Sequence, residues 1–246
     1  MNLRKVFRRD ILTVSRRKLR SIIYGEPEPL FRKCYSQCGE DMIVDFALGM
    51  LAHGKASYLD LGAYHPTRFS NTYQFYLKGC RGVCVEPNPA LAALYKIWRP
   101  DDVVLQAGVG IEANDGVDFY VLTADALSTF SKEEAERICA YGNHKIKEVI
   151  RVPLLTVDAI LSQHFTECPH FVNVDVESLD LAILKSFGFS RYRPMVFCVE
   201  TITYAEDRTE EKIPEVSEFM KSVGYIPFGD TYINTIYVEA AAWRNR

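Results

Sequence analysis

The sequence predicts an α/β protein built on a doubly wound, mostly parallel sheet. Short apolar runs alternate with segments of helical periodicity between residues 57 and 200, and this alternation is typical of strands joined by right-handed helical crossovers. Two of the apolar runs end in an acidic residue, Asp60 and Glu86. The chain then closes on two apolar runs around Gly229 and Asp230, which indicates a C-terminal antiparallel hairpin.

The expected strands are short runs rich in apolar residues and bounded by turn residues. They cover residues 57–61, 82–86, 102–109, 116–122, 151–155, 171–177, 195–200, 225–228 and 235–238. The run 116–122 alternates apolar and polar residues, which predicts an edge strand.

The expected helices follow these strands and begin at capping residues or prolines. They cover residues 42–48, 70–79, 89–98, 132–140, 156–161, 179–187 and 213–223. The segment 70–72, Ser-Asn-Thr, is predicted to cap the second of them, because such side chains accept hydrogen bonds from unpaired N–H groups.

Composition favours one α/β domain of residues 35–246 with an N-terminal extension of residues 1–34. The 246 residues are 48% hydrophobic and 25% charged, with a net charge of −3, so no general affinity for nucleic acid is expected. The seven cysteines form no C-x-x-C pair, which indicates reduced thiols in a cytoplasmic protein. No apolar run is long enough to predict a membrane span.

The N-terminal extension differs from the rest of the chain in its net charge and in the spacing of its apolar residues. Residues 1–20 contain eight Lys and Arg and one acid, a net charge of +7, and residues 1–24 have the apolar spacing of an amphipathic helix. Three interpretations stay open: a solvated tail, a helix lying on an anionic membrane or glycolipid, and an organelle-targeting peptide.

The first expected strand and the turn after it indicate the ligand. In a nucleoside-binding sheet a carboxylate at the tip of the second strand, here Glu86, accepts hydrogen bonds from the ribose hydroxyls. Asp60, Gly62 and Tyr64 lie in the turn expected to meet the rest of the cofactor. This turn lacks Gly-x-Gly-x-x-Gly, so a pyrophosphate has little room, and no P-loop sequence occurs. A phosphate-free nucleoside such as S-adenosylmethionine fits better.

An ordered set of motifs resembles the FkbM family of S-adenosylmethionine-dependent methyltransferases. The motifs are Ser36–Asp41, Leu59–Thr72, Gly82–Pro89, Leu127–Phe130, Asn173–Glu177 and Asn234–Val238. The resemblance implies a Rossmann-like, class I methyltransferase sheet of seven strands and methyl transfer, typically to a hydroxyl oxygen on a sugar, glycolipid or natural product. Where the family commonly has glycine after the fifth motif, this chain has Ser178.

Four residues are candidates for proton transfer, namely Asp175, Glu177, His65 and Glu200, the last at the end of the strand expected at 195–200. Asp175 and Glu177 are two positions apart at the end of an expected strand, so both should point into the ligand crevice. One could accept the proton of an acceptor hydroxyl, or the pair could hold a divalent metal. His65 lies in the ligand-facing turn and has a suitable pKa.

The remaining candidates are cofactor contacts, and rival functions stay open. Gln37 precedes the fold in a polar motif that could close over the cofactor, and Asn71 lies where a helix N-terminus could receive its carboxylate. A non-catalytic interaction module on the same fold is the main alternative to an enzyme. A nicotinamide-dependent dehydrogenase is disfavoured by the missing glycines.

Overall fold

The computed structural model describes residues 33–246 except residues 53, 142, 177–178 and 204–208. Residues Cys34–Arg246 form one compact unit. The predicted amphipathic helix of residues 1–24 lies outside the described residues, so the expected extension and its boundary at residue 34 stay predictions.

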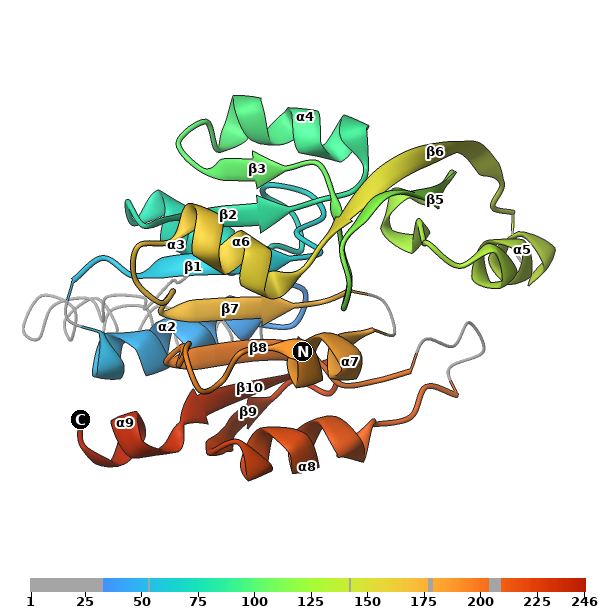
Figure 1. Ribbon diagram of the computed structural model, residues 1–246. Helices are drawn as coiled ribbons and strands as arrows, with labels where there is room; N and C mark the ends of the chain where they lie inside the picture. Colours follow the sequence, from blue (N-terminus) through green and yellow to red (C-terminus); the bar gives the residue numbers. More distant parts are fainter. Residues whose placement is uncertain (1–32, 53, 142, 177–178, 204–208) are drawn as a thin grey trace, which may run out of the picture. The chain divides into compact units, whose positions relative to one another are not determined.

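A seven-stranded sheet forms the centre of this unit (Figure 1). Five strands are parallel, and β10 runs antiparallel between β8 and β9. The order across the sheet is β3 (Val103–Leu105), β2 (Arg81–Val85), β1 (Ser57–Leu61), β7 (Phe171–Val174), β8 (Val196–Glu200), β10 (Asn234–Glu239) and β9 (Tyr225–Asp230). The chain reverses its direction of winding between β1 and β7, which creates a topological switch point there. The predicted fold class is confirmed.

Alternating side chains on the strands divide the core between the two faces of the sheet. Leu59 and Leu61 of β1 belong to one core cluster, whereas Tyr58 belongs to the other. The first cluster includes side chains of α6 (Val157–His164), α7 (Asp180–Ser186) and α8 (Pro214–Ser222). The second includes side chains of α2 (Glu40–Leu51), α3 (Tyr73–Leu77) and α4 (Pro89–Trp98). A short helix, α9 (Ala240–Arg244), ends the chain and was not expected.

Several predicted boundaries are wrong. The strand expected at 171–177 ends at Val174, so Asp175 lies beyond it, and the strand expected at 151–155 begins at Ile146. The helix expected at 42–48 runs through Gly49 to Leu51. The helix expected at 70–79 is the five-residue α3, and the Thr72 side chain does not cap it. The Thr72 hydroxyl donates to the carboxylate of Asp60 instead, and its oxygen accepts from Nη1 of Arg99 rather than from an N–H group of the helix. Ser70 accepts from the Tyr73 amide at 3.2 Å, as a cap would.

The strand expected at 102–109 is also divided. Strand β3 ends at Leu105, and β4 (Gly108–Val109) joins a second sheet of order β4-β6-β5 with β5 (Asn114–Leu122) and β6 (Ile146–Leu155). Gly108 permits the crossing, because a Cβ atom there would lie 2.4 Å from the Phe130 ring. The predicted edge strand 116–122 is confirmed as an edge of this small sheet.

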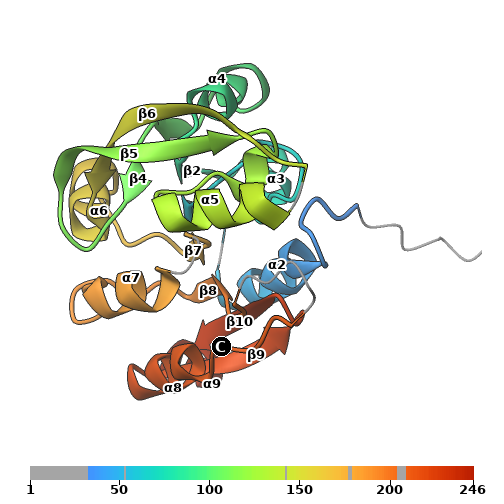
Figure 2. The same cartoon turned by 90° about the vertical axis from the view of Figure 1, so that its right-hand side faces the viewer.

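The small sheet lies beyond the carboxyl ends of the parallel strands (Figure 1). Helix α5 (Lys132–Tyr141) packs against β5 through Ala135, Ile138 and Leu122. Figure 2 shows this helix beside the small sheet. A 3-10 helix, η1 (Asp125–Leu127), connects β5 towards α5. In the part of the chain that the structure describes, no helix has both the length and the apolar character needed to cross a bilayer.

Candidate functional site

A cavity of about 690 Å³ opens where the parallel strands end and the small sheet begins. The strand ends contribute its polar lining, namely Asp60, Gly62, Glu86, Asn173, Asp175 and Glu200. The small sheet and its loops add Phe119, Ser128 and Phe130 on the opposite side. The cavity therefore lies at the carboxyl ends of the strands, where the doubly wound topology predicts a ligand.

Gly62 makes the first turn of this cavity possible. Its φ is +77°, and a Cβ atom at this position would lie 1.7 Å from the carbonyl oxygen of Asp175. The Asp175 amide in turn donates to the Leu61 carbonyl at 3.0 Å. The ends of β1 and β7 therefore approach so closely that no side chain fits between them, and only glycine adopts this backbone without strain.

The amides of this turn are already used within the protein. Gly62 and Ala63 both donate to the Val85 carbonyl, at 3.2 and 3.0 Å. The Tyr64 amide donates to Oε2 of Glu86 at 2.8 Å. A turn that binds pyrophosphate presents its N–H groups to the ligand, and three successive N–H groups are not available here.

Glu86 lies at the tip of β2, is 5% exposed as a residue, and lines the cavity. Its Oε1 accepts from the Asn88 amide at 2.7 Å, and its Oε2 accepts from Tyr64. Burial raises the pKa of the Glu86 carboxyl to about 8, although the two backbone amides counteract this. Each carboxylate oxygen retains capacity for a second hydrogen bond, because a carboxylate accepts about four.

Asp60 lies deeper, at 1% exposure, and both its oxygens are paired. Oδ2 accepts from the Thr72 hydroxyl, and Oδ1 accepts from Nδ2 of Asn173 at 2.9 Å. Burial raises the pKa of the Asp60 carboxyl, while the nearby charge of Arg99 and these two hydrogen bonds lower it. Asp60 is therefore a fixed carboxylate beneath the cavity.

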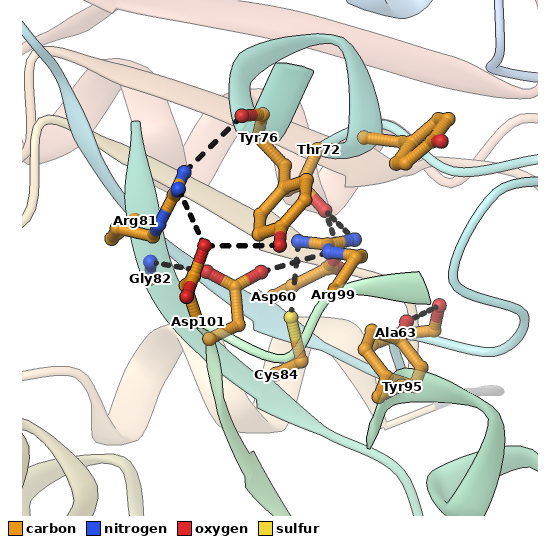
Figure 3. Close-up of polar contacts among 12 residues, drawn as sticks. Asp60, Ala63, Thr72, Tyr76, Arg81, Gly82, Cys84, Tyr95, Arg99 and Asp101 are labelled. Atoms are coloured by element: carbon orange, nitrogen blue, oxygen red, sulfur yellow. Dashed lines mark hydrogen bonds and ion pairs between the residues drawn. The ribbon is translucent and has the colours of Figure 1, made fainter. Parts of the chain in front are cut away.

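The buried side chain of Arg99 is connected to the Asp60 carboxylate through the hydroxyl of Thr72 (Figure 3). The Arg99 side chain is 0% exposed and pairs with Asp102 at 2.8 Å between Nε and Oδ2. Its Nη1 donates to the Thr72 hydroxyl at 3.0 Å, and its Nη2 donates to the Tyr58 hydroxyl at 3.0 Å. The sequence did not reveal this role, because an arginine directly after a helix usually lies at the surface and contacts the last carbonyls.

The side-chain amides of Asn71 and Asn173 extend the polar lining of the cavity from Asp60 towards β8. Asn71 donates to Oδ1 of Asn173 at 2.8 Å and to the Cys198 sulfur at 3.8 Å. Both amides are buried and line the cavity. Asn173 was not singled out as a site residue. Its position two residues before Asp175, on the same face of an apolar strand, was the available signal.

The predicted proton-transfer residues do not all meet in the cavity. Asp175 lines it and is half-buried, as is Glu200 at the end of β8. Glu177 lies outside the described residues. His65 is not among the lining residues, and its Nδ1 accepts from the amides of Thr67 and Arg68, both at 3.2 Å. Burial, followed by the charge of Arg68, lowers the pKa of His65.

The remaining predicted cofactor contacts lie at the cavity. Tyr64 lines it with a left-handed backbone, at φ 50°, and Gln37 lines it as an exposed side chain just before α2. Among the described residues, no group of three or more His, Cys, Asp or Glu side chains could hold a metal ion. The predicted pair Asp175–Glu177 is outside that test, since Glu177 is not described.

The family model described as "Methyltransferase FkbM domain" matches residues 60–227. The chain belongs to the FkbM methyltransferase family. The match begins at Asp60 and covers every cavity residue named above except Gln37. The seven-stranded sheet with its antiparallel β10 is accordingly the Rossmann-like sheet of a class I methyltransferase. No curated protein matches the chain.

Solved structures with the same general fold are distant in sequence. Precorrin-6y C5,15-methyltransferase from Geobacter metallireducens is 11% identical, with a TM-score of 0.40, over 79% of this chain and 85% of that chain. A TehB-like methyltransferase from Corynebacterium glutamicum is 10% identical, with a TM-score of 0.41, over 92% and 96%. CalS10, an amino pentose methyltransferase from Micromonospora echinaspora, is 10% identical, with a TM-score of 0.41, over 87% and 100%. These likenesses are too distant to indicate a substrate.

Proposed function

We propose that this FkbM-family protein transfers the methyl group of S-adenosylmethionine to a hydroxyl oxygen of a sugar, glycolipid or natural product. The observation that carries the proposal is the Glu86 carboxylate, buried at the tip of β2 and facing a cavity of about 690 Å³. A carboxylate at this place matches the two hydroxyl donors of a ribose.

The described residues fit S-adenosylmethionine better than a dinucleotide. Glu86 would accept the ribose hydroxyls on its remaining lone pairs, and Asp60 would face the ammonium group of the methionine part. Apolar side chains of the small sheet and α4 would cover the adenine, namely Leu91, Phe119 and Phe130. The amides of residues 62–64 are occupied, so a pyrophosphate would find no donors in this turn.

Asp175 is the residue that we propose to receive the proton of the acceptor hydroxyl. S-adenosylmethionine supplies a methyl group made electrophilic by the adjacent sulfonium. A neutral hydroxyl is a weak nucleophile, and a positioned base contributes about 10²–10⁴-fold to such a step. Asp175 is fixed relative to the cofactor turn, because its amide binds Leu61 and its carbonyl packs against Gly62. Glu177, two positions along the chain, and Glu200, which lines the cavity, are the alternative bases.

The test is transfer of radiolabelled methyl from S-adenosylmethionine to a panel of glycans, glycolipids and hydroxylated natural products, followed by identification of the methylated atom. We expect an O-methyl product with the wild type and a loss of about 10²-fold or more with Asp175→Asn. His65→Gln should retain most of the rate if Asp175 is the base. Product methylated only on nitrogen or carbon would contradict the proposed reaction, and near-normal turnover by Asp175→Asn would contradict the assigned base.

The metal requirement follows from the same assay. If chelation by EDTA stops transfer and Mg²⁺ or Mn²⁺ restores it, Asp175 and Glu177 act as metal ligands in addition to, or in place of, the base. If EDTA has no effect, the proton transfer belongs to the carboxylates alone.

Partners and compartment are proposals from the sequence. We propose a small-molecule or glycan acceptor, no nucleic acid, a cytoplasmic location, and peripheral membrane contact through the basic residues 1–24. The seven cysteines are all free thiols, three of them buried, which is compatible with a reducing compartment.

A further inference from the structure

We infer that Arg99, which does not line the cavity, positions Asp60 for the ammonium group of the cofactor through the hydroxyl of Thr72. The inference rests on the proposed function, because it assigns the ligand group that Asp60 meets. It adds a residue 39 positions along the chain from Asp60, at the end of α4, to the machinery of the cofactor site.

The two hydrogen bonds that connect Arg99 to Asp60 through Thr72 have a fixed order of donor and acceptor. A guanidinium group has donors and no acceptors, so Thr72 Oγ1 must accept from Nη1 of Arg99 at 3.0 Å. The single hydroxyl proton of Thr72 is then directed to Oδ2 of Asp60. Arg99 therefore determines that Thr72 donates to Asp60 and that this oxygen remains an acceptor.

A second series of hydrogen bonds ends on the other carboxylate oxygen of Asp60, which again is the acceptor. Asn71 donates to Oδ1 of Asn173, and Nδ2 of Asn173 donates to Oδ1 of Asp60. Both series end on the carboxylate, so its orientation is fixed from two sides. These two hydrogen bonds lower the pKa of the Asp60 carboxyl and oppose the effect of burial, and a ligand cation would favour the same ionised form.

One acidic group beneath the cavity lies outside the Arg99–Asp102 ion pair. Arg99 and Asp102 balance each other at 2.8 Å. Burial raises the pKa of the Tyr58 hydroxyl and of the Cys84 thiol, so both stay neutral. Asp60 is the acidic member of the cluster that lines the cavity, and burial raises the pKa of its carboxyl as well. A ligand cation at the cavity floor would balance the charge of its ionised form.

An arginine is required at position 99, because its guanidinium group donates to several acceptors at once. Its Nε pairs with Asp102, and its Nη2 donates to the Tyr58 hydroxyl. Its Nη1 donates to Thr72, and its Nη2 also donates to the Cys84 sulfur at 3.3 Å (Figure 3). A lysine ammonium has three donors at one point and cannot span these positions. Arg99→Lys should therefore keep the charge and lose the contact to Thr72.

The experiment compares two ligands by calorimetry. S-adenosylhomocysteine carries the ammonium group, whereas 5′-methylthioadenosine has the same ribose and adenine and lacks it. Thr72→Val removes the hydroxyl and leaves the Arg99–Asp102 pair in place. We expect Thr72→Val and Arg99→Lys to weaken S-adenosylhomocysteine binding by about tenfold or more, since a charge-assisted hydrogen bond network is disrupted. Both should bind 5′-methylthioadenosine within about twofold of the wild type, because its recognition does not use Asp60.

Two controls separate positioning from stability. Thr72→Ser retains the hydroxyl and should restore the wild-type ratio of the two affinities. Tyr225→Phe removes a buried hydroxyl that binds the Pro194 carbonyl at 2.8 Å, away from the cavity lining, and should change neither affinity. If Arg99→Lys does not fold, Thr72→Val alone decides the question.

The outcomes also separate this inference from the proposed function. Equal weakening of both ligands by Thr72→Val, or no weakening of S-adenosylhomocysteine, would overturn the positioning role while the cofactor assignment stands. A wild type that binds neither ligand would overturn the proposed cofactor and this inference with it.

Discussion

The floor of the cavity and its acceptor rim differ in how firmly the fold holds them. The floor consists of Asp60, Gly62, Asn71, Glu86 and Asn173, and all of its polar side chains are buried and hydrogen-bonded within the protein. The rim consists of Gln37, Phe69, Asp175, Leu179 and Glu200, of which Phe69 and Leu179 are 61% and 45% exposed.

The difference matches two tasks. The floor is set by β1, β2 and β7 in the centre of the sheet, so it is organised before any ligand arrives, as a site for one constant ligand should be. The rim draws on residues from loops and on side chains that face solvent, and such positions can change without disturbing a core. Under the proposed function, the central strands would recognise the cofactor and the rim residues would contact the acceptor.

The largest effect is expected where the floor depends on the backbone itself. Gly62→Ala would place a Cβ atom 1.7 Å from the Asp175 carbonyl oxygen, at a positive φ. Neither backbone can move without breaking pairs between β1 and β7, so we expect destabilisation of about 4 kcal/mol or more, or failure to fold. Urea unfolding monitored by circular dichroism measures the change.

A matched glycine elsewhere provides the control. Gly49 lies inside helix α2, and a Cβ atom there would meet nothing within 4 Å. Gly49→Ala should stabilise the protein by about 0.5–1 kcal/mol. Similar effects of the two substitutions would mean that the close approach beneath the cavity is not rigid, and the contrast between floor and rim would fail.

The second effect is a pH dependence that belongs to the floor. The pKa of Glu86 is raised by burial from its ordinary value of 4.5 to about 8 in the folded protein. The folded state then holds a proton that the unfolded state has released, so this contribution to stability is complete below pH 4.5 and is lost as the pH rises through 8. The loss is at most about 5 kcal/mol. Affinity for S-adenosylhomocysteine should change in the opposite sense and rise through pH 8, since the ionised form accepts both ribose hydroxyls.

Glu86→Gln is the matched variant, because it does not titrate. Thermal unfolding and calorimetry of both proteins between pH 5 and 9 should show a difference that grows with pH. Parallel pH profiles for the two proteins would show that Glu86 does not titrate in this range and that the floor carries no such proton.

The smallest effect on the cavity is expected from deleting residues 1–24, which belong to neither region. Their net charge of +7 favours adsorption to anionic lipid by about 1 kcal/mol per basic residue near the surface, and salt screens it. Deleting them should leave S-adenosylhomocysteine binding unchanged and reduce sedimentation with anionic liposomes at low salt. Equal sedimentation of the full and shortened chains would identify a solvated tail, and lost cofactor binding would show that the floor depends on this segment.

The floor was predictable from the sequence where local pattern decides the structure. Apolar runs ending in Asp60 and Glu86 predicted both the strands and the place of the carboxylates, because parallel strands expose their ends at one edge. The family resemblance implied a seven-stranded class I sheet, and the structure supplies the order of its strands. The small sheet did not follow, since the pairing of Gly108 with Leu154 joins residues 46 positions apart, and periodicity carries no information on such partners.

The support beneath the floor was not predictable. Thr72 has the sequence signature of a helix cap, and only the buried carboxylate of Asp60 explains why its hydroxyl turns inward. Arg99 has the signature of a helix end at the surface, yet its side chain is 0% exposed. Both depend on contacts between elements, where tertiary partners override local preference.

The most direct test of the account is calorimetric titration of S-adenosylhomocysteine into the wild type and Glu86→Ala at pH 8.5, with circular dichroism to verify folding. We expect binding to the wild type and a loss of about 100-fold or more in the variant, since two charge-assisted hydrogen bonds of about 1.5–3 kcal/mol each are removed. NAD should bind neither protein. Unchanged affinity in a folded Glu86→Ala protein would contradict the assignment of the cavity floor as the cofactor site.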